Sequence, residues 1–299
     1  MRINDVFIEQ KEVGAGRAVI AGHVELDADK DMDGVLVTIT DEATGRVLGE
    51  WQADLKRGTN RVTVDFVLHK PKLWWSNGLG EPFLYRFRTD IIAGGELLDS
   101  KTERVGIRSL KVVHQPDKDG HTFYIELNGR PVFAKGANYI PSDNFLPRVT
   151  PENYKRTILD AAGVNMNMLR VWGGGIYEND VFYDLCDEHG IMIWQDFMFA
   201  CCVYDLTEEF DRNIRAEFAD NIRRIRHHAS LGLWCGNNEM EYFLEMDEKG
   251  WCLKPSQKSD YFKMFEYIIP QVLKELDPGT FYWPASPSSG GGFDAPKMK

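Results

Sequence analysis

The sequence predicts a β-sandwich followed by a parallel α/β domain, on three observations. Apolar residues alternate with polar ones from Arg17 to about Val113, as in strands with one buried face. From about Val132 onward, short apolar runs alternate with segments of helical period. A polar stretch at 114–120 separates the two patterns and predicts a boundary, with residues 1–113 as the first domain and 114–299 as the second.

Composition excludes several classes of protein. The 299 residues are 43% hydrophobic and 12% aromatic, which is typical of a globular protein. A net charge of −11 argues against nucleic acid as a partner, because nothing would neutralise the phosphates. The sequence contains no run of about 18 apolar residues, so no membrane span is expected. The N-terminal residues lack the apolar core of a signal peptide, and the compartment stays open.

Tryptophan and cysteine usage narrow the chemistry further. Eight tryptophans suit a protein that stacks on flat, half-polar ligands such as sugars or bases. Five cysteines form an odd set without CxxC spacing, so neither a disulfide framework nor a zinc site is indicated. No cofactor is expected.

In the first domain, three segments show the clearest alternation of apolar and polar residues: 35–39, 62–68 and 85–89. Turn residues lie between them, at Asp31–Gly34, Gly58–Asn60 and Ala93–Gly95. No helical pattern interrupts this region, so we expect an antiparallel, immunoglobulin-like β-sandwich. Of the adjacent Trp74 and Trp75, at least one should lie in the core.

The second domain opens with a predicted hairpin that turns at Asn128–Gly129. Strands are then expected at 132–140, 165–172, 191–200, 231–234 and 281–284. The intervening helices are expected from Thr150 (N-cap) to Gly163, through Val181 and Leu185 to Gly190, through Phe210 and Ile225, and from Ser259 to Leu276 with a kink at Pro270.

Repeated strand–helix units predict parallel strands with right-handed crossovers, in an open doubly wound sheet or in a (β/α)₈ TIM barrel. Polar or aromatic residues lie at or near the carboxyl end of every expected strand: Asn138, Trp172, Asp196, Asn238, Glu239 and Ser286. A barrel gathers its chemistry at all strand ends, whereas an open sheet gathers it at one switch point, and the barrel is therefore favoured. A complete barrel needs about 250 residues, so a truncated barrel is expected.

Several candidate sites have a structural alternative. Gly173–Gly175 lacks the spacing of a nucleotide loop and is expected to be a tight turn that leaves Trp172 facing a pocket. His189, His227 and His228 fall on predicted helices without an HExxH motif, so no metal site is expected. Cys201 and Cys202 are expected to pack rather than to act as nucleophiles.

Glu239 is the candidate catalytic residue, because it follows the apolar run Leu231–Trp234. A general acid for glycoside cleavage is a carboxyl held protonated beside the leaving oxygen. Asn238 would hold a sugar hydroxyl next to the cleaved bond, and Trp172 would form a wall or stacking floor for the ring. Asp196 either touches the ligand or is a buried hydrogen-bond partner. Glu241 is the alternative acid.

Five motifs, in colinear order, resemble the β-mannosidases of glycoside hydrolase family 2. They are WWSNGLGEP (Trp74–Pro82), KGANYIPSD (Lys135–Asp143), RVWGGGIYE (Arg170–Glu178), WQDFMFA (Trp194–Ala200) and WCGNNE (Trp234–Glu239). The resemblance implies retaining hydrolysis of terminal β-D-mannosyl residues of a glycan, with Glu239 as acid/base, Asn238 on a hydroxyl and Trp172 in the sugar subsite.

The resemblance also implies a second glutamate, the nucleophile, on a later barrel strand. Nothing in residues 1–299 matches it, so we expect an internal fragment that is inactive alone. The alternatives are another family 2 exo-glycosidase (a β-galactosidase, β-glucuronidase or exo-glucosaminidase) and a non-catalytic carbohydrate-binding protein. The natural glycan and the oligomeric state are left open.

Overall fold

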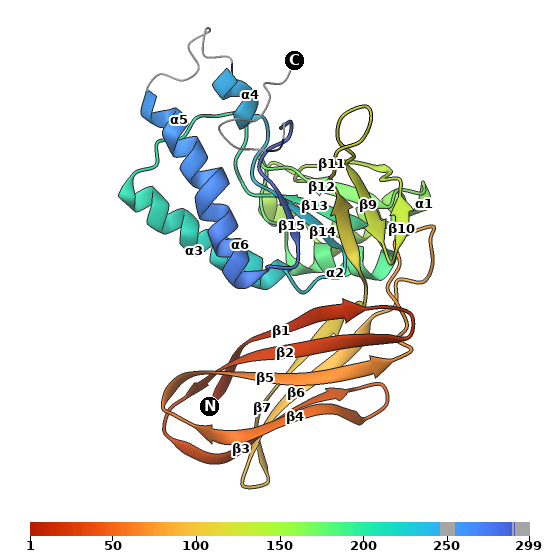
Figure 1. Ribbon diagram of the computed structural model, residues 1–299, viewed down its shortest axis with the longest axis vertical. Helices are drawn as coiled ribbons and strands as arrows, with labels where there is room; N and C mark the ends of the chain where they lie inside the picture. The colour runs from red at the N-terminus through yellow and green to blue at the C-terminus, as the bar shows by residue number, and fades with distance from the viewer. Residues whose placement is uncertain (246–254, 289, 291–299) are drawn as a thin grey trace. The chain divides into compact units, whose positions relative to one another are not determined.

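The computed structural model describes residues 1–245, 255–288 and 290, and it contains two compact units (Figure 1). The first unit comprises Met1–Leu110 with the short segments 126–132 and 227–229. The second comprises 111–125, 133–226 and 230–299.

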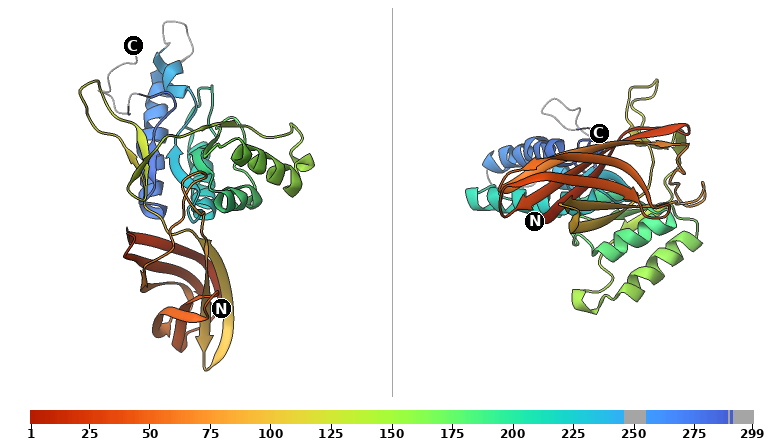
Figure 2. Two further views of the ribbon diagram at one scale, coloured as in Figure 1. Left: turned by 90° about the vertical axis from the view of Figure 1, so that its right-hand side faces the viewer. Right: turned by 90° about the horizontal axis from the view of Figure 1, so that it is seen from below.

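The first unit is built from two antiparallel sheets. One has the order β1-β2-β5, with β1 at Arg2–Val13, β2 at Arg17–Ala28 and β5 at Gly58–His69. The other has the order β4-β3-β6-β7, with β4 at Arg46–Leu55, β3 at Met32–Asp41, β6 at Tyr85–Ala93 and β7 at Glu96–Val105. Figure 2 (left) shows them as two layers, β1 and β2 in red and β6 and β7 in yellow.

The alternation in the sequence corresponds to buried and exposed faces. Val35, Val37 and Ile39 are fully buried, and Trp74 is also fully buried while Trp75 is half-buried. These strand and core predictions are therefore confirmed. Strand β1 was not predicted. Two β-bulges interrupt its pairing with β2, between Ile3 and Asp5 and between Gln10 and Glu12, and each bulge breaks the period of two.

A small sheet has the order β10-β9-β8, with β8 at Leu110–Val113, β9 at Tyr124–Leu127 and β10 at Arg130–Val132. Asn128 and Gly129 join β9 to β10 with φ angles of 50° and 77°, as the predicted hairpin requires. The division between the two units falls within this sheet.

The second unit contains a parallel sheet of five strands in chain order, β11-β12-β13-β14-β15. The strands are β11 (Gly136–Tyr139), β12 (Met168–Val171), β13 (Met192–Asp196), β14 (Leu231–Cys235) and β15 (Phe281–Trp283). Each strand pairs with the next one along the chain, so the described sheet has no switch point of the doubly wound kind.

One expected strand was wrong in its extent. The run at 132–140 is divided, because Val132 ends the antiparallel strand β10 and the parallel strand β11 begins only at Gly136. A β-carbon at Gly136 would collide with the carbonyl of Met168 on β12. The close backbone approach at Gly136 therefore starts the parallel pairing, and apolar content alone does not reveal it.

The expected helices appear in order as α1 (Pro151–Gly163), α2 (Asp180–His189), α3 (Glu208–Ile225), and α5 (Pro255–Phe262) with α6 (Ile269–Leu276). Helix α4 (Met240–Glu245) was not predicted. A short 3₁₀ turn, Leu146–Arg148, precedes α1. Helix α1 packs on α2, and α3 packs on α6 (Figure 1). Their apolar faces join the strands in one core.

Helix ends agree with the sequence signals. Thr150 and Asn153 form a capping box at the start of α1, and Gly190 ends α2 in the left-handed conformation with φ 68°. The expected helix 259–276 consists of α5, a π-helical turn at Lys263–Ile268, and α6. Pro270 lies in the first turn of α6, and because proline has no N–H the regular ladder is interrupted there.

Candidate functional site at the carboxyl ends of the parallel strands

The chain beyond β13, β14 and β15 continues the parallel pairing. Asn238 pairs with Ala200 on one side and with Ser286 on the other. The Cys201 N–H donates to the carbonyl of Asn238 at 3.0 Å, and the Glu239 N–H donates to the carbonyl of Ser286 at 3.0 Å. The backbone that presents Glu239 is therefore fixed from both neighbouring strands.

Asn237 is a structural residue of this end. It is fully buried, and its Nδ2 donates to the carbonyl of Pro284 at 2.9 Å. Its Oδ1 accepts the N–H of Met240 at 3.0 Å and so satisfies a free donor at the start of α4. With both ends of its amide engaged, Asn237 anchors the turn that carries the next two residues.

Glu239 is half-buried and has a left-handed backbone, with φ 63°. A non-glycine residue in this region costs roughly 1–2 kcal/mol. The hydrogen bond from its N–H to Ser286 holds it there, and its Oε2 accepts a hydrogen bond from Cys201 Sγ at 3.5 Å. Backbone strain of this kind gathers at functional sites, which supports a role for this residue.

The carboxylate of Asp196 is fully buried and accepts four hydrogen bonds. Arg170 donates two, from Nε to Oδ1 at 3.2 Å and from Nη2 to Oδ2 at 2.8 Å. The Trp194 Nε1 donates to Oδ1 at 3.0 Å, and the Gly173 N–H donates to Oδ2 at 3.0 Å. Of the two roles that the sequence left open for Asp196, this burial favours that of a hydrogen-bond partner.

Burial raises the pKa of the Asp196 carboxyl, and the charge and hydrogen bonds of Arg170 oppose that rise. The hydrogen bonds from Gly173 and Trp194 also favour the ionised form. Arg170 keeps only 17% of its side-chain surface exposed, so the pair is largely shielded from water. A partly buried bidentate pair of this kind sets the position of both side chains.

Arg170 links four strands at this end of the sheet. Besides holding Asp196, it donates from Nη1 to Asn138 Oδ1 at 3.3 Å and from Nη2 to Asn238 Oδ1 at 3.0 Å. Arg170 was not predicted as a site residue. Its signal was a charged residue inside the otherwise apolar strand Met168–Val171, since a charge in such a strand needs a partner.

Trp172 is half-buried just after β12, and the three glycines behind it form a tight turn. The Gly175 N–H donates to the carbonyl of Trp172 at 3.0 Å. A β-carbon at Gly174 would collide with the indole ring of Trp172, and one at Gly173 would lie 2.6 Å from the carbonyl oxygen of Phe199. Close approach therefore explains the glycines, as the sequence predicts a tight turn at this point.

An aromatic pocket of about 420 Å³ lies next to this site. Its lining residues are His114, His121, Phe123, Trp194, Trp283, Ser286, Pro287 and Ser288. Two of them are connected to the site, since Trp194 donates to Asp196 and the carbonyl of Ser286 accepts from the Glu239 N–H. Flat aromatic walls with a few polar groups suit a half-polar ligand.

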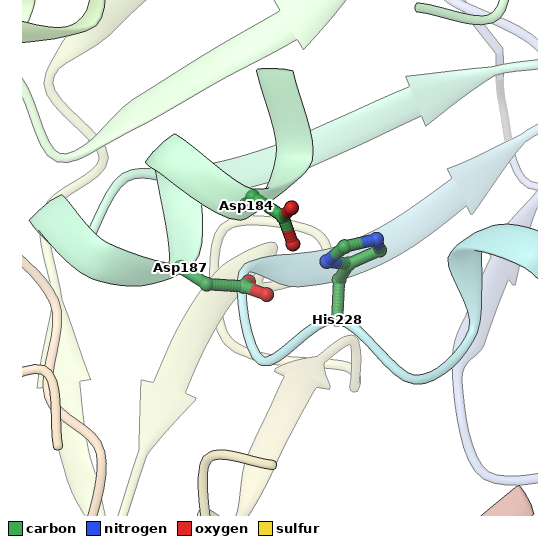
Figure 3. A group of neighbouring side chains, drawn as sticks. All are labelled: Asp184, Asp187 and His228. Carbon is green, nitrogen blue, oxygen red and sulfur yellow. The ribbon is translucent and has the colours of Figure 1, made fainter. Parts of the chain in front are cut away.

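Of two neighbouring aspartates on helix α2, Asp187 has a structural role away from this site. Asp184 and Asp187 lie one turn apart on this helix (Figure 3). The buried Asp187 accepts the N–H of Ser230 at 2.7 Å, which fixes the residue before β14. His228, the third residue labelled in Figure 3, belongs to the first unit.

The described cysteines differ in their exposure. Cys186 and Cys235 are buried thiols, whereas Cys201 and Cys202 are exposed. Cys252 lies outside the described residues.

Among the helices of the described segments, none combines the length and apolar character that crossing a membrane would require.

Comparison with known proteins relates both units to one family. Residues 1–108 match the family model for glycosyl hydrolases family 2. The chain is 39% identical to β-mannosidase B of Aspergillus fumigatus over 246 residues, which cover 79% of this chain and 28% of the relative. It is 36% identical to β-mannosidase B of Aspergillus niger over 285 residues, which cover 92% of this chain and 33% of the relative.

The chain belongs to glycosyl hydrolase family 2. A solved β-D-mannosidase from Dictyoglomus thermophilum superposes on 97% of this family 2 chain, with a TM-score of 0.84 and 36% identity, and 36% of that protein is covered. An exo-chitosanase from Amycolatopsis orientalis has a TM-score of 0.76 at 20% identity over 96% of this chain and 32% of its own, and it shares the fold.

The match covers only part of each relative. This family 2 chain spans about a third of the length of the curated β-mannosidases that it matches, between 28% and 35% of each. The resemblance seen in the five motifs is confirmed by these identities. Four of the five motifs, from Lys135–Asp143 to Trp234–Glu239, lie on or next to the strands that build the site, whereas Trp74–Pro82 lies in the first unit.

Proposed function

We propose that this family 2 chain supplies the general acid/base, Glu239, of a glycosidase that removes terminal non-reducing β-D-mannose residues from a glycan. The observation that carries the proposal is the placement of Glu239. It follows parallel strand β14, its backbone is held by Ser286, and its carboxylate lies beside Cys201. Enzymes of barrel type keep their chemistry at this end of the strands.

The reaction would proceed by retaining double displacement. A second carboxylate attacks the anomeric carbon while Glu239 donates its proton to the glycosidic oxygen, so a glycosyl–enzyme ester forms as the glycosidic bond breaks and the leaving sugar departs as an alcohol. In the second step the Glu239 carboxylate takes a proton from water, whose oxygen attacks the same carbon and breaks the ester bond, which frees the second carboxylate and releases the sugar with its configuration retained. The nucleophile must be a second carboxylate about 5–5.5 Å away, and the proposal assigns it to a part of a full-length protein outside residues 1–299.

Asn238 is the proposed hydroxyl-binding residue. Its Oδ1 accepts from Arg170 at 3.0 Å, and its Nδ2 donates to Cys201 Sγ at 3.2 Å. An amide nitrogen carries two hydrogens, so a second N–H remains for a sugar hydroxyl. The Arg170 contact decides which way the amide faces, because a guanidinium can only donate.

Trp172 and Asp196 complete the proposed sugar site in different ways. Trp172 is half-buried, and its indole is supported from behind by Gly174, so it can form the wall against which the pyranose ring packs. Asp196 acts without touching the sugar: it fixes Arg170, which in turn fixes Asn238.

The fold assignment belongs to the same proposal. We assign residues 1–113 to an immunoglobulin-like β-sandwich and 114–299 to the N-terminal part of a (β/α)₈ catalytic barrel. Two antiparallel sheets support the first assignment, and five parallel strands in chain order support the second.

Mannose as the substrate is supported by the relatives at 36–39% identity that are named β-mannosidases. The experiment compares hydrolysis of 4-nitrophenyl β-D-mannoside, β-D-galactoside, β-D-glucuronide and β-D-glucosaminide by the full-length protein. The mannoside should have the highest kcat/KM. Faster cleavage of any of the other three would reject mannose and leave the family 2 glycosidase intact.

The role of Glu239 is tested by Glu239→Gln, with Glu241→Gln as the matched control two residues later in helix α4. Loss of a general acid lowers the rate by about 10²–10⁴-fold. The loss should be largest for a poor leaving group such as methanol and smallest for 2,4-dinitrophenol, which departs without protonation. Equal losses for both leaving groups, or the larger loss in Glu241→Gln, would refute the assignment.

A further inference from the structure

A continuous series of hydrogen bonds joins the buried ion pair to Glu239. Asp196 holds Arg170, and Arg170 Nη2 donates to Asn238 Oδ1 at 3.0 Å. Asn238 Nδ2 donates to Cys201 Sγ at 3.2 Å, and Cys201 Sγ donates to Glu239 Oε2 at 3.5 Å. The thiol of Cys201 makes the last connection, although Cys201 was expected only to pack.

The backbone of Cys201 is arranged for this contact. Its N–H donates to the carbonyl of Asn238 at 3.0 Å, and its φ is 48°, in the left-handed region that few non-glycine residues adopt. Glu239 also has a positive φ, of 63°. Two strained residues on neighbouring strand ends thus face each other through their side chains, which indicates a functional constraint rather than simple packing.

The protonation state of the thiol fits a donor. Burial raises the pKa of the Cys201 thiol, and the hydrogen bond to Glu239 raises it further. The Asn238 hydrogen bond and the charge of Arg170 act in the opposite direction, and Tyr204 also lies near the thiol. The sulfur therefore keeps its proton at neutral pH and offers an S–H donor, not a thiolate nucleophile.

We propose that Cys201 is a positioning residue for the acid/base: its S–H fixes the Glu239 carboxylate, and the Asn238 amide fixes the sulfur. This inference rests on the proposed function of Glu239. A glutamate side chain has three rotatable bonds, and only a carboxyl group held at the leaving oxygen can transfer its proton efficiently. The thiol restricts that freedom without adding a competing charge.

Cys202 is the matched control. It is the neighbouring residue and is also exposed, but its Sγ contacts the carbonyl of Val203 at 3.6 Å. Of these two thiols, it is Cys201 that donates a hydrogen bond to Glu239. Any effect of general thiol loss should appear at both positions, whereas an effect on Glu239 should appear only at Cys201.

The first experiment measures the contact without using activity. In the full-length protein carrying Cys202→Ser, iodoacetamide alkylation of Cys201 is followed by mass spectrometry between pH 6 and 10, with and without Glu239→Gln. Because Glu239 raises the thiol pKa, the midpoint of alkylation should move to lower pH in Glu239→Gln. An unchanged midpoint would overturn the inference.

The second experiment measures catalysis in Cys201→Ala, Cys201→Ser and Cys202→Ala. A lost hydrogen bond to the acid/base should lower kcat about tenfold in Cys201→Ala, with KM within about twofold. Cys201→Ser should restore most of kcat, and Cys202→Ala should match the wild type.

The two experiments separate the inference from the function on which it rests. If Glu239→Gln abolishes hydrolysis while the alkylation midpoint and Cys201→Ala activity stay unchanged, Glu239 keeps its role and the positioning role is rejected. If the alkylation midpoint moves while Glu239→Gln remains active, the hydrogen bond is real and the catalytic assignment fails.

Discussion

Arg170 donates two hydrogen bonds to the fully buried carboxylate of Asp196, at 3.2 and 2.8 Å. The pair joins strand β12 to β13, and through Asn238 it reaches the end of β14. Its geometry makes the carboxyl end of the sheet rigid at the point from which Glu239 projects.

Removing one charge of this pair should be costly. Asp196→Asn leaves Arg170 partly buried and without its counter-charge, and breaking a buried pair costs about 3–5 kcal/mol. We expect a fall of about 3 kcal/mol in the free energy of unfolding, measured by urea denaturation. The control is Asp211→Asn, which removes the more exposed pair between Asp211 and Arg215 on helix α3 and should cost less than about 0.5 kcal/mol. Equal losses would contradict the structural role of Asp196.

The left-handed backbone of Glu239 predicts a trade between stability and activity. Glycine adopts φ 63° without strain, whereas alanine retains the penalty. Glu239→Gly should therefore be more stable than Glu239→Ala by about 1 kcal/mol, and both variants should lose hydrolysis. Thermal unfolding of the two variants side by side measures the difference. If alanine were as stable as glycine, the strain inferred at this position would be absent.

Gly174 predicts a steric effect on Trp172. A β-carbon at this position collides with the indole ring, so Gly174→Ala should displace the ring and destabilise the protein by about 1–3 kcal/mol. We also expect a higher KM for the mannoside, because the proposed wall of the sugar site moves. At Gly163, the last residue of α1, a β-carbon meets no atom within 4 Å, and Gly163→Ala should be neutral or slightly stabilising. Unfolding midpoints and KM values of the two variants give the comparison.

Glu178 predicts a specific pH dependence of stability. It is buried, its Oε2 accepts the hydroxyl of Tyr154 at 2.6 Å, and burial raises the pKa of its carboxyl above 4.5. A raised carboxyl pKa means that the folded state binds the proton more tightly, so this contribution to stability is complete below pH 4.5 and is lost as the pH rises through the folded value.

The variant Glu178→Gln is permanently neutral and can still accept from Tyr154. Its stability relative to the wild type should therefore be greatest at pH 7 and should decline as the pH falls toward 4.5. Urea denaturation of both proteins at pH 4.5, 5.5 and 7 tests this sign. A relative stability that rises toward acid pH would show that Glu178 is instead stabilised as a carboxylate.

Much of the fold could be predicted because its signals are local. The N-cap at Thr150, the left-handed end at Gly190 and the hairpin turn at Asn128–Gly129 are each set by a few adjacent residues. Strand β1 was missed because its bulges break the period, and the start of β11 was misplaced because Gly136 is required by a distant carbonyl. Errors occurred where pairing, not propensity, decides the outcome.

The candidate site shows the same division between local pattern and tertiary contact. The sequence alone determined the family resemblance, the order of strands and helices, and the position of Glu239 after an apolar run, because each of these is written along the chain. Only the tertiary structure revealed that Arg170, Asn238 and Cys201 form one hydrogen-bonded series, since they come from three strand ends that are up to 68 residues apart in sequence. Parallel strands bring their carboxyl ends together whatever their separation along the chain, and the partners of a buried charge are then chosen by distance in space.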